Sequence, residues 1–535
     1  MAGLLTAHEK TNTFKVDVCR ESVALSLLLF LQFCTGCAPK DPDMKTEKIR
    51  VAFKYNKAAD YYDPVNISFA PEYDFLENIY STLVEYSPEG ELAGSVAESF
   101  EWVGSEAHFK IRQDLFTIDG KRIDAYDVEQ SFKRLFILGG NTHGDLKDVV
   151  CPNMELKNFS DKCPGMEVRD AGRTFVFKLK EKKVFLFPML ASIDFAIIPR
   201  DSVDKVTFKI KDYRNTSGPY FVSKDSATGQ IELSANSRHF HYSKNIPQEV
   251  VFVPSGKTEP LQSLDLFSEN KVDFITTIDS IPPDIMIDYA EKHKKDATLH
   301  STHALDTFLL IFTGKGLHTF SERERFAIGK KFREIFLERY LKKPGYEAAE
   351  QIFPAFGGGG LTMEQLSGIG AKMASASTSD IKARKIKVWN INFTNNFEST
   401  EAEYKSLFPG IEFLSIRKIP GRVDYSAEKL SEPDYYLMRT DMGFQEDINL
   451  LSYYLGIDFF ALEKDTSKQW LRKYISTQDK KERLQMVRDL HFDTLSRAAV
   501  IPLAKTPYTA LARKPWVFNM SKLHANDPIW RISQK

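Results

Sequence analysis

The sequence has almost no net charge and few cysteines, and it contains no apolar run long enough to cross a membrane. Among its 535 residues, 72 Lys and Arg stand against 73 Asp and Glu, which leaves a formal net charge of −1. A chain without a positive field gives no indication of nucleic-acid binding, so we expect no nucleic acid among its partners. The 42% hydrophobic and 27% charged content is typical of a globular protein and excludes wholesale disorder.

Motifs for nucleotide binding and serine catalysis are absent as well. The glycine-rich stretch "FGGGGL" (356–361) lacks the Gly-Lys-Ser/Thr that completes a phosphate-binding loop. No Gly-x-Ser-x-Gly occurs, which disfavours a serine nucleophile. The histidines in "RHFHY" (238–242) and "LHSTH" (299–303) lie two and three residues apart, whereas paired metal ligands on a helix usually lie about four apart. We therefore expect no cofactor, no metal and no catalytic residue, although carboxylates are too plentiful for spacing alone to decide on a glycosidase pair.

The longest apolar run, residues 23–33, leads directly to two cysteines. The run is 11 residues long, short of the roughly 20 that span a bilayer but suited to the apolar core of a signal peptide. It is followed by Cys34-Thr35-Gly36-Cys37. A redox or zinc motif would need a second cysteine pair or packed elements on both sides, and the sequence offers neither. The spacing instead resembles a bacterial lipobox, in which small residues directly precede the cysteine that becomes lipidated.

This interpretation predicts the compartment and the first part of the chain. Residues 1–37 are expected to form a lipoprotein signal peptide, Cys37 to carry the lipid, and residues 38–47 to form a polar, proline-containing tether. Acidic residues near the start are unusual for a signal peptide and indicate translation from Val16 or Val18. We expect the protein on the periplasmic or cell-surface face, lipid-anchored to a membrane.

Two cysteines remain within the expected mature chain, Cys151 and Cys163, 12 residues apart. Outside the cytoplasm an even pair at this spacing predicts a disulfide. The alternative is two buried, unpaired thiols.

Periodic patterns predict a mixed α/β protein with strands gathered in the first half and at the end of the chain. Alternation in "KIRVAFKY" (48–55) predicts a first strand. The stretch "DAYDVEQSFKRLF" (124–136) predicts a helix that is capped by Asp124, with a second aspartate three residues on. Apolar residues that recur every four positions predict a helix over 320–342, and "AVIPLA" (499–504) predicts a strand.

Several stretches, in this order along the chain, resemble the family 5 extracellular solute-binding proteins, the oligopeptide- and dipeptide-binding components of ABC importers. The resemblance covers nearly all of 48–530, except for 344–420, which match poorly. The stretches that carry it are "YDPVNIS" (62–68), "ENIYSTLVEYSPEGELAGSVAESFEW" (77–102), "FKIRQDLFTIDGKRIDAYDVEQSFKRL" (109–135), "TSGPY" (216–220), "LFSENKVDF" (266–274) and "AVIPLAKTPYTALARKPWV" (499–517).

The resemblance implies a fold. Members of this family have two α/β lobes joined by crossing strands, and they close around a ligand by hinge motion. We therefore expect the two-lobed type II periplasmic-binding-protein fold in its large oligopeptide-binder variant, with mixed sheets and a hinge between the lobes. The expected domains are lobe one at 48–256 with an inserted subdomain at about 72–188, lobe two at 257–498, and a return to lobe one at 499–535. The segments expected to cross are 249–255 and 499–504.

The resemblance also implies a function, that of a substrate-binding receptor of an ABC importer. Such a receptor captures oligopeptides or similar small solutes by lobe closure and delivers them to the permease subunits in the membrane. An extended peptide held through its backbone is bound with tolerance for its side chains. We expect a monomer that is not an enzyme. A secreted lipoprotein hydrolase, or a sensor on a related two-lobed scaffold, is the alternative.

The family holds the amino terminus of a peptide with an aspartate in a Gly-Trp-x-x-Asp stretch, and here the sequence departs from it. The corresponding segment is "YYLMRTDMGFQEDINLLSYY" (435–454), and the alignment places Gly443 where that aspartate lies. A buried ammonium group needs a charged partner, so we expect a nearby carboxylate, Asp441 before the others, to bind a cationic ligand end. The expected ligand-binding residues are Asp441, Gly443, Glu446 and Asp447, with Tyr435, Phe444 and Trp516 as aromatic walls.

Overall fold

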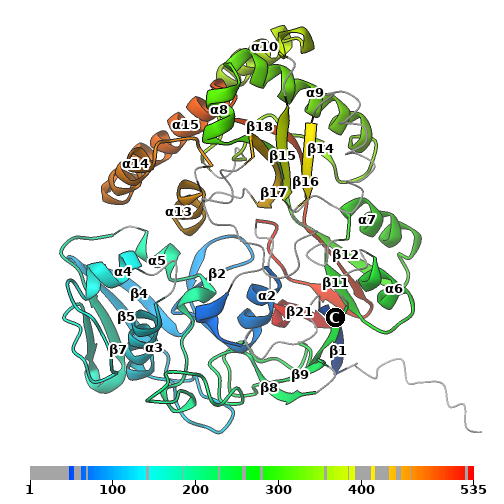
Figure 1. The fold of residues 1–535 in the computed structure, drawn as a ribbon. Helices are drawn as coiled ribbons and strands as arrows, with labels where there is room; N and C mark the ends of the chain where they lie inside the picture. Colours follow the sequence, from blue (N-terminus) through cyan, green and yellow to red (C-terminus); the bar gives the residue numbers. More distant parts are fainter. Residues whose placement is uncertain are drawn as a thin grey trace, which may run out of the picture. The chain divides into compact units, whose positions relative to one another are not determined.

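The computed structural model describes residues 47–53, 62–67, 70–139, 144–183, 185–226, 229–255, 261–276, 281–354, 358–382, 385–391, 411–415, 433–441, 448–457, 459–523 and 528–534. All of them belong to one unit of the chain, residues 47–535. Helices and strands alternate along it (Figure 1).

The helices are α2 (Ala70–Ile79), α3 (Ala125–Leu138), α4 (Gly144–Val150), α5 (Leu186–Met189), α6 (Gln262–Ser268), α7 (Pro283–Lys292), α8 (Gly314–Thr319), α9 (Glu322–Tyr340), α10 (Met363–Ser375), α13 (Ile448–Gly456), α14 (Lys464–Ser476) and α15 (Lys480–Ser496). The strands of the three larger sheets are β1 (Lys48–Phe53), β4 (Ala97–Val103), β5 (Glu106–Ile111), β6 (Met166–Arg169), β7 (Thr174–Lys178), β8 (Tyr220–Asp225), β9 (Ile231–Ala235), β10 (Glu249–Pro254), β11 (Phe274–Thr276), β12 (Ala297–Ser301), β13 (Asp306–Phe312), β14 (Glu347–Ala348), β15 (Ile386–Ile391), β16 (Ile411–Ser415), β17 (Tyr435–Asp441), β18 (Val500–Thr506) and β19 (Thr509–Arg513). Two small ribbons pair β2 (Val84–Tyr86) with β3 (Leu92–Gly94), and β20 (Trp516–Phe518) with β21 (Ile532–Gln534).

The largest sheet has seven strands in the order β12-β19-β11-β1-β10-β9-β8 within the described residues. Its central strands β11, β1 and β10 are parallel, and antiparallel strands flank them on both sides. The alternation that predicts β1 divides its side chains between the two faces of the sheet. Val51 and Phe53 join a core with Phe75 of α2, whereas Ala52 joins a second core with Met286 of α7. Helices α6 and α7 lie together beside β11 and β12 (Figure 1).

A four-stranded sheet, β4-β5-β7-β6, packs against helix α3. The side chain of Asp124 accepts hydrogen bonds from the backbone N–H groups of Tyr126 and Asp127, and the side chain of Asp127 accepts one from the N–H of Asp124. This reciprocal capping box starts α3 at the residue that the sequence predicts, so the predicted cap is confirmed.

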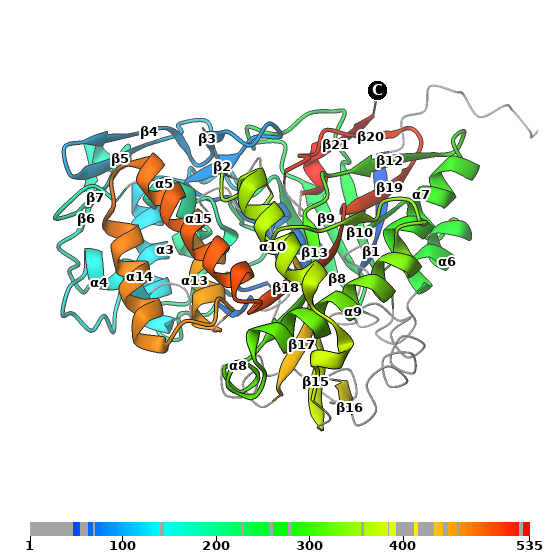
Figure 2. The same cartoon turned by 90° about the horizontal axis from the view of Figure 1, so that it is seen from above.

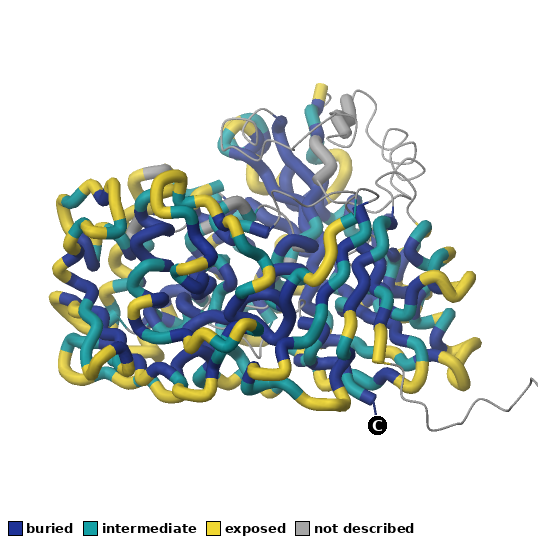
Figure 3. Tube along the Cα trace, turned by 90° about the horizontal axis from the view of Figure 1, so that it is seen from below, coloured by how far each residue is buried: buried dark blue, intermediate teal, exposed yellow. Residues whose placement is uncertain are grey.

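The six-stranded sheet, β14-β18-β13-β17-β15-β16, carries the long helix α9 on β18. A Cβ at Gly329 would lie 2.6 Å from Cγ1 of Ile501, so only glycine allows helix and strand to approach this closely. Phe332 and Phe336 follow Gly329 at helical spacing and are buried. The helix predicted over 320–342 is confirmed as α9. Buried residues gather along the strands and on the inner faces of the helices (Figure 3).

The chain crosses between the seven- and six-stranded sheets at different places from those the sequence predicts. The segment expected to cross at 249–255 forms β10, an internal strand of the seven-stranded sheet, and that prediction is wrong. Residues 257–301, assigned from the sequence to lobe two, still supply β11 and β12 to the seven-stranded sheet. The first crossing is at 302–305, between β12 and β13. The stretch 499–504 forms most of β18. The second crossing follows β18, at 507–508, and leads into β19.

Cys151 and Cys163 are joined by a disulfide with a Cα–Cα distance of 5.0 Å. Both residues are buried in the core beside the four-stranded sheet. None of the helices in the described part of the chain is long and apolar enough to cross a membrane.

Candidate functional site

The two crossing segments are hydrogen-bonded to each other. The backbone N–H of Thr302 donates to the carbonyl of Tyr508 at 3.0 Å, and the N–H of Tyr508 donates to Oγ1 of Thr302 at 2.9 Å. On either side of this bridge the same two stretches of chain continue as paired strands, β12 with β19 and β13 with β18. Two adjacent connections therefore join the two sheets, an arrangement that permits hinge motion about a few residues.

An ion pair lies next to these connections. Asp306, the first residue of β13, pairs with Arg439 of the neighbouring strand β17. Only 1% of the Asp306 side chain and 11% of the Arg439 side chain are exposed. The guanidinium carbon of Arg439 also lies 5.7 Å from the centre of the Phe308 ring, where the negative face of the ring favours a cation. The strand register brings these side chains together, because Arg439 is paired with Phe308 across the ladder.

Burial sets the electrostatics of the pair. Burial raises the pKa of the Asp306 carboxyl, and the nearby Arg439 opposes this effect. Burial would lower the pKa of Arg439, but the charge and hydrogen bond of Asp306, together with Tyr508 and Tyr346, outweigh burial, and the pKa is raised. Each charge therefore depends on the other, since an isolated ion in such a place costs several kcal/mol (roughly) in desolvation.

The pair is incompletely satisfied within the described part of the protein. Oδ1 of Asp306 has no hydrogen-bond partner there, and neither has Oγ1 of Thr506, the register partner of Asp306 on β18. Both oxygens are buried, and a buried polar atom without a partner costs about 1–3 kcal/mol. The two groups are suited to accept donors from a bound molecule, and Arg439 is suited to bind an anionic one.

The residues expected at the ligand site fall in several places. Asp441 ends β17 and is the backbone register partner of Asp306. Gly443, Phe444, Glu446 and Asp447 lie outside the described residues, as does Cys37.

The two remaining aromatic residues of the expected site lie in cores. Tyr435 is 0% exposed, and its ring centre lies 5.3 Å from that of Phe312 and 5.6 Å from that of Phe332. Trp516 is 2% exposed and packs in the core of the seven-stranded sheet. In this structure both rings contribute to packing rather than to an open surface.

Sequence reasoning missed Asp306 and Arg439. Arg439 lies two residues before Asp441, and it is the one cation in the strand "YYLMRTD". A charge inside such an apolar stretch is a usable signal, because charged residues are almost never fully buried unless they are paired. Asp306 stands directly before the apolar run "TFLLIF", and its pairing with a residue 133 positions away could not be read from the sequence.

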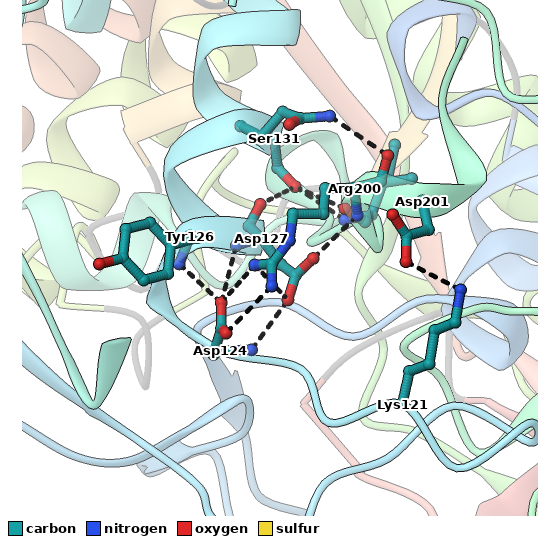
Figure 4. Close-up of polar contacts among 9 residues, drawn as sticks. Lys121, Asp124, Tyr126, Asp127, Ser131, Arg200 and Asp201 are labelled. Carbon is teal, nitrogen blue, oxygen red and sulfur yellow. Dashed lines mark hydrogen bonds and ion pairs between the residues drawn. The ribbon is translucent and has the colours of Figure 1, made fainter. Parts of the chain in front are cut away.

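A second polar cluster joins the start of α3 to the segment around Arg200 (Figure 4). Arg200 donates to Oδ1 of Asp124 at 2.5 Å, and its backbone N–H donates to Oδ1 of Asp127 at 2.8 Å. Oγ of Ser131 donates to the carbonyl of Asp127 at 2.7 Å and accepts from the N–H of Ile198 at 2.8 Å. Burial raises the pKa of Asp127 to about 6, although hydrogen bonds from backbone N–H groups oppose this. The polar groups of this cluster form hydrogen bonds with one another, so we interpret the cluster as structural.

One serine–histidine contact bears on the hydrolase alternative. Nε2 of His239 lies 3.2 Å from Oγ of Ser81. Nδ1 of His239 accepts a hydrogen bond from the backbone N–H of His241 at 3.1 Å, which places the ring proton on Nε2. His239 therefore donates to Ser81, whereas a general base must accept the serine proton. The contact is that of a buried structural histidine, and burial lowers the pKa of His239 well below its usual value.

The histidine pairs singled out in the sequence take up separate contacts. His241 bonds to Glu85 at 2.9 Å and stacks on Trp530, while His300 lies 2.9 Å from the carbonyl of Ser521. Within the described residues, no cluster of three or more His, Cys, Asp or Glu is arranged to hold a metal ion.

A part of the chain matches a known protein family. The model of the family "Bacterial extracellular solute-binding proteins, family 5 Middle" matches residues 91–334. Over this span the chain is similar to the family 5 extracellular solute-binding proteins. A sequence comparison with curated proteins finds no significant match to this chain.

Solved structures share the fold of this protein at low sequence identity. The murein tripeptide binding protein MppA of Escherichia coli matches with a TM-score of 0.69 and 14% identity, over 91% of this chain and 98% of that one. OppA of Haemophilus influenzae, in complex with RPPGFSPFR, matches with a TM-score of 0.67 and 13% identity over 92% and 99%. NikA of Brucella suis, in complex with Fe(III)-EDTA, matches with a TM-score of 0.71 and 15% identity over 91% and 100%. The predicted two-lobed type II α/β fold is confirmed.

Proposed function

We propose that this protein is the extracytoplasmic substrate-binding receptor of an ABC importer and that it captures oligopeptides. The family match supports the receptor role, and two of the similar structures are of peptide-binding proteins. The observation that carries the ligand class is the buried Asp306–Arg439 pair beside the two connections between the sheets. A peptide offers both an ammonium and a carboxylate end, and such a pair complements either one.

The two lobes of the proposed receptor follow from sheet membership. We assign the seven-stranded sheet, with the four-stranded sheet inserted in its sequence, to lobe one, and the six-stranded sheet to lobe two. In this assignment residues 302–305 and 507–508 are the hinge. Closure about them brings a ligand into contact with groups near the start of β13 and the end of β17.

The anchor and the destination of the ligand complete the proposal. Residues 1–37 act as a lipoprotein signal peptide, Cys37 carries the lipid, and residues 38–47 form the tether to a monomeric receptor. The receptor delivers its ligand to the permease subunits of the importer. The lipobox spacing after the apolar run supports this part of the proposal.

A thermal-shift screen tests the function. A ligand that binds only the folded state raises the melting temperature, by an amount that grows with ligand concentration above Kd. We expect a shift with a mixture of short peptides, and none with the same peptides N-acetylated and C-amidated or with sugars. A nickel–histidine complex serves as a further arm. A shift confined to sugars or nickel complexes contradicts the peptide assignment, and turnover of a chromogenic ester or glycoside contradicts the receptor assignment.

A further inference from the structure

A pocket of about 250 Å³ lies beside the six-stranded sheet, away from the Asp306–Arg439 pair. It is lined from helices α9, α10 and α15, strand β18 and the segment after β14. Helix α10 contacts both α9 and α15, and the three helices lie close together in Figure 2. The lining is largely apolar, with Leu366, Ile369, Ile501 and Pro502 among its members.

One arginine projects among these apolar side chains. Arg333 lines the pocket from α9, one helical turn after Gly329. Because Gly329 packs closely on Ile501 of β18, Arg333 emerges from the same face of the helix, directly beside the sheet. Its position is therefore imposed by the packing of helix on strand.

Arg333 is not paired within the described residues. Its Nε is buried and has no hydrogen-bond partner there, and no ion pair joins its guanidinium to a described carboxylate. Burial lowers the pKa of Arg333, and the attraction of Glu350, which also lines the pocket, offsets part of this. A guanidinium partly withdrawn from water without hydrogen-bond acceptors is unfavourable. This arrangement suits a site whose acceptor arrives with a ligand.

The walls of the pocket are fixed by contacts of their own. Nζ of Lys330 donates to the carbonyls of Ala374 and Ala376 at 2.9 and 3.1 Å, which caps the end of α10. Nζ of Lys372 binds Glu322 of α9 and the carbonyl of Ser496 at the end of α15, both at 2.9 Å. These contacts link α9, α10 and α15 to one another and fix the walls of the pocket.

We propose that this pocket binds a small monocarboxylate with an apolar body, such as a medium-chain fatty acid, whose carboxylate pairs with Arg333. Pockets for drug-sized ligands have volumes of about 300–1,000 Å³, and this pocket is slightly smaller, so its ligand is a short one. A neutral apolar molecule would leave the guanidinium unpaired, and a cation would meet it at short range. The site is separate from the proposed peptide site, and this inference does not rest on the proposed function.

Calorimetry with octanoate on the full chain tests the proposal. Octanoate is expected to bind, and 1-octanol, which has the same apolar body without the charge, at least about tenfold more weakly, since a hydrogen bond to a charged group contributes more than a neutral one. Octylamine is expected not to bind. Equal binding of octanoate and 1-octanol, or no binding of octanoate at millimolar concentration, overturns the proposal.

Two charge variants locate the carboxylate. Arg333→Gln is expected to weaken octanoate binding about tenfold or more. Arg323→Gln removes the same charge from the same helix, but its side chain is 69% exposed and pairs with Asp380, so this control should bind octanoate like the wild type. Equal affinity of wild type and Arg333→Gln contradicts the proposal.

Two glycine variants test where the apolar chain of octanoate binds. They also test the proposal independently of Arg333→Gln, in case that variant does not fold. Gly370 lines the pocket and Gly368 does not, both lie on α10, and a Cβ at either meets no atom within 4 Å. Gly370→Leu places a side chain at the pocket and should abolish octanoate binding, whereas Gly368→Leu should leave it unchanged. Both replacements favour the helix. If Gly370→Leu binds octanoate as tightly as Gly368→Leu, the ligand is not in this pocket.

Discussion

Asp306 and Arg439 form an ion pair between adjacent strands of the six-stranded sheet, with 1% and 11% of their side chains exposed. The pair stands where the chain enters this sheet from the seven-stranded one. Buried ion pairs seldom add net stability, because desolvation offsets the attraction between the charges. The place of the pair beside the crossing segments therefore favours a role in ligand recognition over a role in holding the fold together.

Removal of one partner should nevertheless be costly. Asp306→Asn leaves Arg439 charged and buried, and we expect it to lower the free energy of unfolding by about 3–5 kcal/mol. The double variant Asp306→Leu/Arg439→Met removes both charges and should recover most of this loss. Urea denaturation measures all three proteins. The exposed pair of Lys110 and Glu98, with 61% and 37% side-chain exposure, is the control, and Glu98→Gln should cost about 1 kcal/mol or less. If Asp306→Asn lowers the free energy of unfolding no more than Glu98→Gln does, the loss of Asp306 does not leave Arg439 as a buried, unpaired charge, and the prediction is wrong.

His491 should make the protein sensitive to acid. Its Nε2 accepts from the N–H of Ile352 at 2.9 Å, its Nδ1 lies 2.9 Å from the carbonyl of Gly359, and burial lowers its pKa to about 4. As pH falls below the usual histidine value, about 6.5, the unfolded chain takes up a proton that the folded chain refuses, so stability is lost down to about pH 4. The loss amounts to about 3 kcal/mol from this residue.

The His491→Gln variant checks this assignment. Between pH 6.5 and 4 its unfolding free energy should fall less steeply than that of the wild type, by the equivalent of about one proton. His318→Gln, an exposed histidine on α8, is the matched control and should keep the wild-type slope. Identical slopes for His491→Gln and the wild type would contradict a neutral buried His491.

The disulfide between Cys151 and Cys163 should contribute measurably to stability. A bridge over 12 residues restricts the unfolded chain and contributes on the order of 3 kcal/mol. Replacing both cysteines with alanine should lower the free energy of unfolding by roughly this amount. A thiol-reactive dye should label neither residue in the unfolded, unreduced wild type. Labelling of both would rule out the bridge.

Lipidation should depend on Cys37 alone. We expect Cys37→Ser to leave an unprocessed or soluble precursor without incorporated palmitate, because the lipidated cysteine follows two small residues after the apolar run. Cys34→Ser, three residues earlier, is the control and should be processed like the wild type. Radiolabelled palmitate in the Cys37→Ser protein would refute the anchor.

Local patterns in the sequence were enough to predict several elements. The cap of α3 depends on Asp124 and Asp127, three residues apart, so it can be read from the sequence. The alternation of β1 and the four-residue recurrence of α9 are equally local.

Features that depend on distant parts of the chain were missed. The apolar character of 249–255 predicts a crossing strand, but an internal strand covered on both faces has the same apolar character. The Asp306–Arg439 pair depends on the register of β13 against β17, which nothing within either strand encodes. Tyr435 and Trp516 are aromatic residues that suit a ligand wall and a core equally well, and only the packing distinguishes the two.

The most direct test of the proposed function is titration calorimetry with a peptide found by the thermal-shift screen and with its N-acetylated form. We predict that acetylation weakens binding at least about tenfold, because it removes the ammonium charge that Asp441 or Asp447 is expected to pair with. Asp441→Asn or Asp447→Asn should weaken binding of the free peptide in the same way, whereas Asp465→Asn, on the exposed surface of α14, should not. If acetylation leaves the affinity unchanged, and Asp441→Asn and Asp447→Asn do too, no carboxylate of this segment holds a peptide amine and the ligand is not a free peptide.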